Sequence, residues 1–207
     1  MSVQETYLSA AKAFADLVER VPEQAWDRRC LGVWSLREVT AHASTAALSS
    51  VLKALAQQAT AETITSPDGY YALAKTVDPE VYRAAVQAST DGARSDATAL
   101  GDQPARAVRR LVEQVNATLA TISDDPVVES AAGGMRLSAW LPTRTFELAV
   151  HSLDIATSAE IPANLPEAVL ADATALAARI AAASGDATTV LRALTGRAPL
   201  PDCFSVV

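Results

Sequence analysis

The chain contains two histidines, and the second belongs to a row of ionisable residues with helical spacing. Arg144, Glu147, His151 and Asp154 are separated by three, four and three positions, so in a helix their side chains project from one face. Glu147 and His151 would then lie about 6 Å apart. Imidazole nitrogens and carboxylate oxygens are ligands that zinc takes from proteins. The spacing therefore predicts one half of a metal site, and His42 is the candidate for the other half.

The neighbours of this row indicate which way it points. On a helical wheel it lies between two apolar stripes, so we expect it to face the interior. Ionisable groups buried there must be paired, hydrogen-bonded or bound to a metal. Two interpretations stay open at this point, an internal salt-bridge ladder without a ligand and a metal site completed from another helix. The flanking residues are Leu141, Leu148 and Ile155 on one side, and Phe146, Val150 and Leu153 on the other.

A set of three ligands would suit catalysis. Helical bundles build metal sites by bringing ligand pairs together across helices, and His42 could join Glu147 and His151 in this way, although a lone helical histidine is more often a core residue. Three protein ligands leave a coordination position open, as in catalytic rather than structural zinc sites. Behind the ligands, Asp154 is a candidate to orient an imidazole, and Arg144 is a second supporting candidate. An equally good explanation of Asp154 and Arg144 is that their charges only stabilise the helix.

Two helices must position these residues. The first is expected over 35–58, where Ser35 and Glu38 fit a capping box in which each side chain bonds the other residue's backbone N–H. The second helix is expected over 138–156, with Ser138 as its N-cap. Pro142 then falls in the first turn, where its missing N–H has no helical partner to lose.

The rest of the chain predicts an all-α fold. Residues 66–69 have the composition of a turn, and 127–137 give a weak hairpin signal around Gly133 and Gly134. Long amphipathic helices joined by short to moderate loops favour an antiparallel bundle. We expect four principal helices, a middle helical insertion and a short C-terminal helical extension. The remaining expected helices cover residues 4–20, 79–100, 102–122, 166–184 and 187–195.

Composition argues against two classes of partner. A net charge of −7 does not suit nucleic acid, which needs clustered positive charge. No stretch reaches the roughly 18 apolar residues of a membrane span, and neither a targeting signal nor a basic amphipathic segment is evident. We therefore expect a cytoplasmic protein without a membrane partner. Cys30 and Cys203 form no recognisable framework and are interpreted as free thiols, with an approach of Cys30 to the metal as the minor alternative.

Three sequence motifs resemble one known family. WSLREVTAH (34–42) is similar to the second-helix motif of DinB-like metalloproteins, and more closely to the mycothiol-dependent maleylpyruvate isomerase branch. TRTFELAVHSLD (143–154) resembles that branch's fourth-helix motif, where the family places a glutamate and a histidine metal ligand. LRALTGR (191–197) resembles a C-terminal segment of the same group.

The resemblance implies a DinB-like four-helix bundle, a divalent metal that is usually zinc, and mycothiol as a thiol cofactor. It implies His42, Glu147 and His151 as the metal ligands, and a possible homodimer. We expect residues 1–158 to form the metal-binding bundle and 159–207 an extension packed on it. The founding isomerases carry a larger α/β C-terminal domain, so the resemblance does not extend to maleylpyruvate as the substrate.

The function expected from the resemblance is activation of mycothiol by the metal. The thiol would be transferred to a small electrophilic substrate, or would assist the isomerisation of that substrate. Two alternatives remain open. One is a non-catalytic metal-binding bundle that acts as a sensor or interaction module, and the other is a thiol-independent metal hydrolase.

Overall fold

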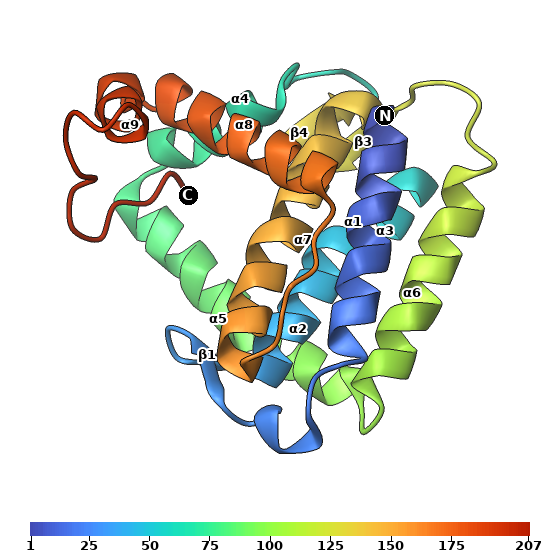
Figure 1. The fold of residues 1–207 in the computed structure, drawn as a ribbon. Coiled ribbons are helices and arrows are strands. Elements are labelled where there is room, and N and C mark those ends of the chain that lie inside the picture. Colours follow the sequence, from blue (N-terminus) through green and yellow to red (C-terminus); the bar gives the residue numbers. More distant parts are fainter.

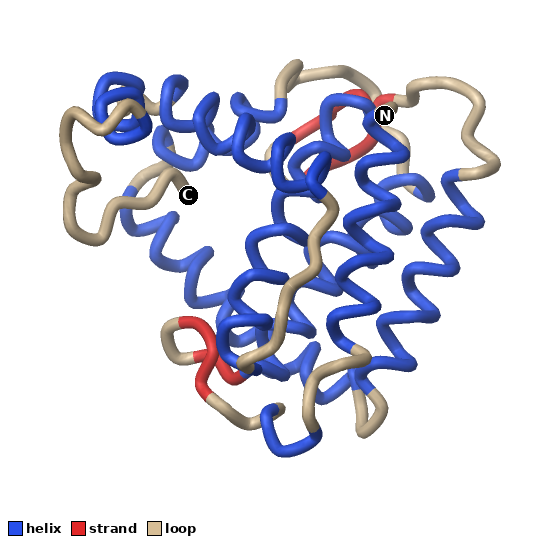
Figure 2. Tube along the Cα trace, in the orientation of Figure 1, coloured by secondary structure: helices blue, strands red, loops and turns tan.

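The computed structural model describes residues 1–207, apart from the side chains at positions 74, 75, 79 and 82. The expected all-α, DinB-like bundle is confirmed, because helices dominate the chain. The strands described are short and form two antiparallel pairs at the ends of the molecule, β1 (Arg29–Leu31) with β2 (Trp34–Ser35) and β3 (Val127–Ser130) with β4 (Gly133–Arg136) (Figure 2).

Long helices that pack side by side form the bundle (Figure 1). Helix α7 is central, with α1 and α2 packed against it, and α1 also contacts α6. Burial of the apolar side chains between them is the main stabilising contribution, at about 25 cal/mol per Å². The helices are α1 (Val3–Val18), α2 (Leu36–Ser44), α3 (Ser50–Ala56), α6 (Pro104–Leu119) and α7 (Leu137–Ala159). Fully buried residues include Tyr7, Phe14, Leu17, Leu36, Leu48, Leu119, Leu141, Leu148 and Ile155.

The helix expected over 35–58 contains a π-helical segment, η2 (Thr45–Ser49), between α2 and α3. Two carbonyls in this segment accept hydrogen bonds from side chains of other helices. Arg144 Nη1 of α7 donates to Ala46 O at 2.7 Å, and the Tyr7 hydroxyl of α1 donates to Ala47 O at 2.7 Å. π-helical turns are rare and frequent at functional sites. The η2 segment is thus hydrogen-bonded to α7 and to α1 at the level of the ionisable row.

The start of α2 follows the prediction, and the start of α7 does not. Ser35 and Glu38 form the expected capping box. Helix α7 begins at Leu137, and Ser138 is not its cap. Instead, the Asp125 carboxylate accepts from the Ser138 backbone N–H at 2.8 Å and from its hydroxyl at 2.7 Å. Because the capping group lies 13 residues earlier in the chain, across the β3–β4 hairpin, helical spacing could not reveal it. Pro142 consequently lies inside the helix rather than in its first turn.

The β3–β4 hairpin is confirmed, but its turn is formed by Ala131 and Ala132, and the two glycines belong to β4. The segment that follows α3 runs against this strand, where the Thr63 N–H donates to Gly134 O at 2.8 Å. A Cβ on Gly134 would lie 1.9 Å from Ala61 O, so only glycine permits this close approach. The other hairpin, β1–β2, was not predicted. Its second strand contains Trp34 and ends directly before the start of α2.

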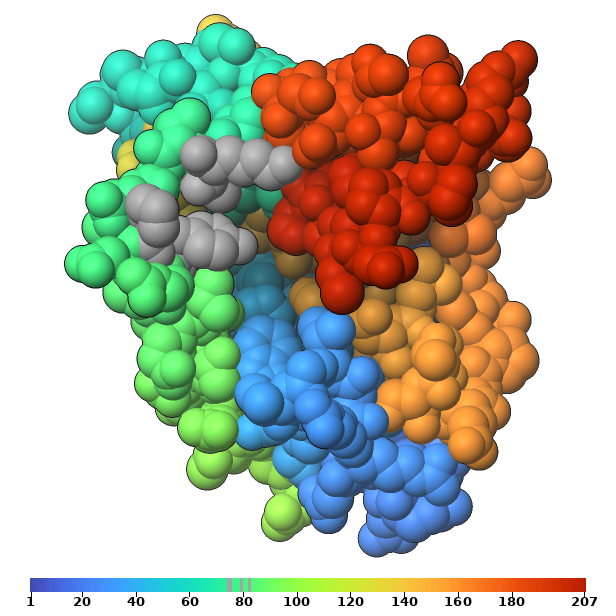
Figure 3. Space-filling view, turned by 90° about the vertical axis from the view of Figure 1, so that its left-hand side faces the viewer, coloured from blue at the N-terminus to red at the C-terminus, as the bar shows by residue number. Residues whose placement is uncertain are grey.

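The middle and C-terminal helices surround the bundle. Residues 66–69, expected as a turn, instead start α4, whose N-cap is Ser66. Helix α5 packs on α2, and α8 packs on α7, α4 and α1. The space-filling view shows a recess between α5 and the last residues of the chain (Figure 3). Among the described residues, no helix is both long and apolar enough to cross a membrane. These elements are α4 (Pro67–Ala72), η3 (Leu73–Thr76), α5 (Pro79–Leu100), α8 (Glu167–Ala183) and α9 (Ala187–Leu194).

Candidate metal centre

Helices α2 and α7 bring His42, Glu147 and His151 together. One ligand atom from each residue lies within 4.8 Å of the others. The two imidazole rings meet edge to face, with centroids 5.3 Å apart, and His151 Nε2 lies 3.5 Å from Glu147 Oε2. The three residues that sequence reasoning selected as metal ligands are therefore neighbours in space, although His42 and His151 belong to different helices.

The row on α7 faces inward at Arg144 and His151, which are buried, while Glu147 and Asp154 are partly exposed. One of the two flanking apolar stripes, with Leu148 and Ile155, is buried as expected. The other is buried only in part: Phe146 packs against α8, whereas Leu153 is 46% exposed.

His151 is held by acceptors on both ring nitrogens. Its Nδ1 lies 3.1 Å from Asp154 Oδ2, one turn along α7. Burial lowers the pKa of the imidazole, but the contacts with Asp154 and Glu147 outweigh it and raise the pKa to about 9. A carboxylate on Nδ1 fixes the tautomer that leaves Nε2 for a metal. Asp154 therefore has the geometry expected of a residue that orients a ligand imidazole.

His42 has a different environment. Burial, and then the positive charge of His151, lower its pKa, so the ring is neutral at pH 7. The indole ring of Trp34 contacts the His42 imidazole, with the two ring centroids 4.8 Å apart. The indole thus fixes the orientation of an imidazole that keeps a free nitrogen lone pair for a metal.

Glu147 is ionised and is contacted by a residue that sequence reasoning missed. The Tyr71 hydroxyl on α4 lies 2.9 Å from Glu147 Oε1, and Arg144 Nη2 lies 4.0 Å from the same oxygen. Burial opposes ionisation, but the hydrogen bond with His151 and the charge of Arg144 lower the pKa of the carboxyl to about 2. Nothing in the spacing around Tyr71 indicates this contact, because the two residues are 76 positions apart.

Arg144 contacts two aromatic rings, with its guanidinium carbon 5.2 Å from the Tyr70 centroid and 5.4 Å from that of Trp140. Its Nε donates to Thr143 Oγ1 at 2.9 Å, and its Nη1 is held by the π-helical carbonyl. Nη2 has no hydrogen-bond partner among the described residues, and neither has Trp140 Nε1. A buried donor without an acceptor costs about 1–3 kcal/mol.

A cavity of about 690 Å³ adjoins this cluster, and His42, Arg144 and Glu147 contribute to its wall. Much of the remaining wall carries hydroxyl groups, together with one lysine and one glutamate. Cys30 is outside both the cluster and this lining; burial raises the pKa of its thiol to about 11. The polar residues of the wall are Thr45, Ser49, Ser50, Lys53, Gln57, Tyr70, Ser89, Glu129 and Ser130.

Fold and site together define a helical bundle with two histidines and a carboxylate gathered beside a large cavity. The sequence matches the family described as mycothiol maleylpyruvate isomerase N-terminal domain over residues 7–156. The chain belongs to this family, and the matched region holds all three residues of the cluster. No curated protein and no solved structure was found to match the chain.

Proposed function

We propose that this protein is a metal-dependent enzyme that activates a low-molecular-weight thiol, mycothiol, for reaction with a small electrophile. The observation that carries the proposal is the convergence of His42, Glu147 and His151 at the edge of a cavity. Family membership supports mycothiol as the thiol.

The donor set suits a divalent metal, with zinc as our choice. Two imidazole nitrogens and one carboxylate oxygen are a usual set in catalytic zinc sites, where a fourth position stays open. Bound there, the ion would supply the positive charge that keeps a thiol deprotonated near neutral pH. We propose His42, Glu147 and His151 as the residues that hold it.

Neighbouring side chains orient the three ligand residues or set their charge. Asp154 accepts from the Nδ1 side of His151, and the hydroxyl of Tyr71 contacts Glu147. Arg144 adds a positive charge that favours the ionised carboxyl, and burial keeps His42 neutral. Each ligand side chain is thereby held in an orientation or a charge state that metal binding requires.

The cavity suits a thiol with a polar, hydroxylated body. Its volume of about 690 Å³ is in the range of small-molecule sites, roughly 300–1,000 Å³. The wall offers hydroxyl and amide groups such as Ser49, Ser50 and Gln57, which donate and accept hydrogen bonds. We propose that the body of mycothiol lies against this wall with its sulfur toward the three ligands.

Two outcomes follow for the electrophile. Attack by the thiolate on an activated carbon–carbon double bond forms a carbon–sulfur bond as the π bond opens, and protonation of the neighbouring carbon then leaves a persistent S-adduct; an electrophile with a leaving group instead expels that group. If the unprotonated adduct rotates about the new carbon–carbon single bond and the carbon–sulfur bond breaks again, the double bond re-forms, the thiolate is released and the substrate has been isomerised. A non-catalytic metal module would be expected to seal its ion from solvent, and a cavity wall that includes His42 and Glu147 favours the enzyme.

The first test is metal content. Elemental analysis of the native protein, prepared without chelator or a polyhistidine tag, is expected to find about one equivalent of metal. His42→Ala and Glu147→Ala should lose it, while Arg109→Ala, at a partly exposed ion pair outside the site, should retain it. Absence of metal from the native protein after zinc is supplied would favour a salt-bridge ladder and overturn the proposal.

The second test separates the thiol-dependent enzyme from a hydrolase. The zinc-loaded protein is incubated with monochlorobimane, an electrophile that fluoresces on S-conjugation, with and without mycothiol. We expect conjugation above the uncatalysed rate with mycothiol and none without it. Ester or amide hydrolysis that needs no thiol, without any conjugation, would instead identify a metal hydrolase.

A further inference from the structure

One face of a continuous helix lines the cavity from the metal cluster outward. Helices α2 and α3 and the η2 segment between them follow one another without a break over residues 36–56. The cavity-lining residues include His42 and then Thr45, Ser49, Lys53 and Gln57, the last four at intervals of four positions. Residues at this spacing are neighbours along a helix surface. At about 1.5 Å per residue, the path from His42 to Gln57 measures roughly 20 Å.

The β3–β4 hairpin lies at the outer end of this path. The Glu129 N–H donates to Gln57 O at 3.4 Å, and Gln58 pairs with Val128. This pairing fixes β3 beside the end of α3, so that Glu129 and Lys53 both line the outer part of the cavity. Both side chains are exposed, and neither makes a hydrogen bond or ion pair with another described residue. A cation, a carboxylate and the Gln57 amide are therefore available to a ligand there.

Two hydroxyl groups in the middle of the path are also available. Thr40, Ser44 and Ser50 each donate to the carbonyl four residues earlier in the helix, as serine and threonine commonly do. Thr45 and Ser49 make no such bond, and their hydroxyls have no other partner among the described residues. Both residues line the cavity. Polar groups without an internal partner thus extend from the metal cluster to the outer end.

Length and charge together restrict the molecule that can use all of these groups. A short thiol with its sulfur at the metal cluster ends within a few bonds and cannot reach Lys53. At the outer end, the ammonium only donates hydrogen bonds and the carboxylate only accepts them. A hydroxyl does both, so neighbouring hydroxyls on one ring satisfy Lys53 and Glu129 together. An anionic or cationic end would meet one like charge. The cavity therefore favours a long, neutral, polyhydroxylated molecule.

We propose that Lys53, Gln57 and Glu129 form a distal subsite that binds the inositol end of mycothiol and selects this thiol over shorter ones. Mycothiol joins N-acetylcysteine, glucosamine and inositol in that order, so its sulfur and its inositol are at opposite ends. The identity of the ligand rests on the proposed function. The preference of the subsite for a long polyhydroxylated molecule rests on the cavity alone.

Two thioethers are suitable probes, S-methyl mycothiol and S-methyl-N-acetylcysteinamide. Both are neutral at the sulfur end, neither can form a thiolate or react with an electrophile, and only the first carries the sugar and inositol. Titration calorimetry measures their affinities for the metal-free and the zinc-loaded protein. We expect S-methyl mycothiol to bind both forms at least about tenfold more tightly than the short probe, because it gains two or more hydrogen bonds.

Substitutions at the outer end should affect only the long probe. Lys53→Met and Glu129→Gln are each expected to weaken S-methyl mycothiol about fivefold, as for loss of one hydrogen bond. They should leave the short probe and the metal content unchanged. In the conjugation assay, they should raise the KM for mycothiol and retain the kcat. Lys12→Met and Glu113→Gln make the same changes at exposed residues outside the cavity lining, and should change no affinity.

The outcomes separate this proposal from the proposed function. If the protein takes up no metal, but S-methyl mycothiol binds and Lys53→Met weakens it, the metal-dependent function fails and the distal subsite stands. Equal affinities for the two probes, including no binding of either, would overturn the subsite. So would an effect of Lys53→Met or Glu129→Gln on S-methyl mycothiol no larger than that of the matched control, or an equal effect on both probes.

Discussion

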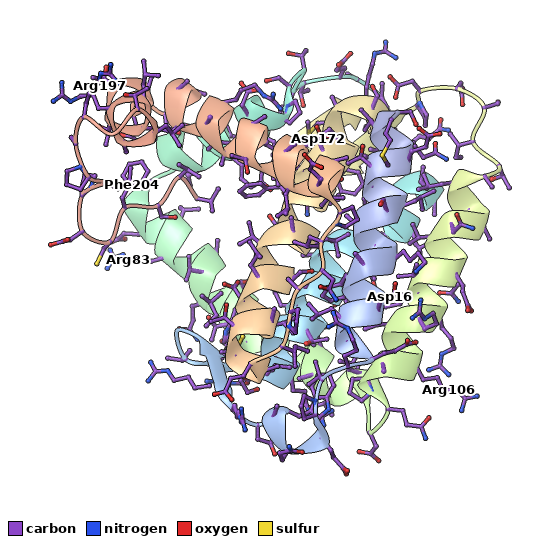
Figure 4. All side chains as sticks on the ribbon, in the orientation of Figure 1. Asp16, Arg83, Arg106, Asp172, Arg197 and Phe204 are labelled. Atoms are coloured by element: carbon purple, nitrogen blue, oxygen red, sulfur yellow. The ribbon has the colours of Figure 1, made fainter. Side chains whose placement is uncertain are left out.

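Two clusters of charged side chains join helices of this bundle, and their geometries differ. Between α1 and α6, Arg109 Nη2 lies 2.8 Å from Asp16 Oδ1 and 2.7 Å from Glu19 Oε1, with all three side chains partly exposed to water. Figure 4 shows Asp16 on the side of α1 that faces α6. Each charge meets an opposite charge at hydrogen-bond distance, so this cluster is complete without a ligand.

The cluster between α2 and α7 is more deeply buried and, apart from the 3.1 Å contact of His151 with Asp154, less closely paired. Arg144 and Glu147 are 4.0 Å apart, and Glu147 and His151 are 3.5 Å apart. Side-chain exposure is 6% for Arg144, 10% for His151 and 21% for Glu147, so water compensates less than it does at Arg109. Buried charges normally require closer pairing than surface ones. The comparison favours a binding site over a salt-bridge ladder for the row on α7.

The largest expected difference between the clusters is in stability. Arg144→Met should lower the free energy of unfolding by about 3–5 kcal/mol, because it leaves Glu147 and the Ala46 carbonyl buried without this partner. Arg109→Met should lower it by less than about 1 kcal/mol, because water solvates the released carboxylates. Urea unfolding at pH 7 measures both. Equal losses would mean that the α7 cluster behaves as a surface ion pair.

Zinc should stabilise the protein through the buried cluster alone. At a hundredfold excess over its Kd, a ligand that binds only the folded state adds about 2.7 kcal/mol, or roughly 8 °C in Tm for a chain of this size. We expect this shift for the native protein and for Arg109→Met, and its loss in His42→Ala. Thermal unfolding with and without zinc measures it. The same shift in His42→Ala would place the bound zinc elsewhere.

Zinc affinity should depend on pH through His151. Its pKa of about 9 in the metal-free protein means that the imidazole holds a proton at pH 7, which zinc must displace. His42, whose pKa is lowered, is already neutral and releases none. Affinity should therefore rise by about tenfold per pH unit between pH 7 and 9 and then level off. Calorimetry in buffers of different ionisation enthalpy would report about one proton released at pH 7, and release of none would contradict the assignment of His151.

The smallest expected effect tests the residue that sequence reasoning missed. Tyr71→Phe removes the hydroxyl that contacts Glu147 but retains the ring that packs on Phe146. Loss of one hydrogen bond of about 1 kcal/mol should weaken zinc binding about fivefold. Competition with a chromogenic chelator measures the affinity, and an affinity equal to that of the native protein would remove Tyr71 from the support of the site.

The sequence by itself determined the features that depend on neighbours along one helix. The spacing of Glu147, His151 and Asp154 placed them on one face of α7, and Ser35 with Glu38 marked the start of α2. These predictions succeeded because helical geometry fixes which residues are adjacent at three and four positions. The turn at 66–69 and the Ser138 cap were wrong, since similar local patterns can start a helix or be satisfied by a more distant group such as Asp125.

Only the tertiary structure decided how these local pieces meet. It joined His42 to the pair on α7, aligned Tyr71 with Glu147, and left Arg144 and Trp140 with unpaired donors beside a cavity. None of these contacts follows from a periodic pattern, because each depends on how whole helices pack on one another. The residue types of the candidate site could therefore be predicted from the sequence, whereas the cavity and its free donors arise from the packing of the bundle.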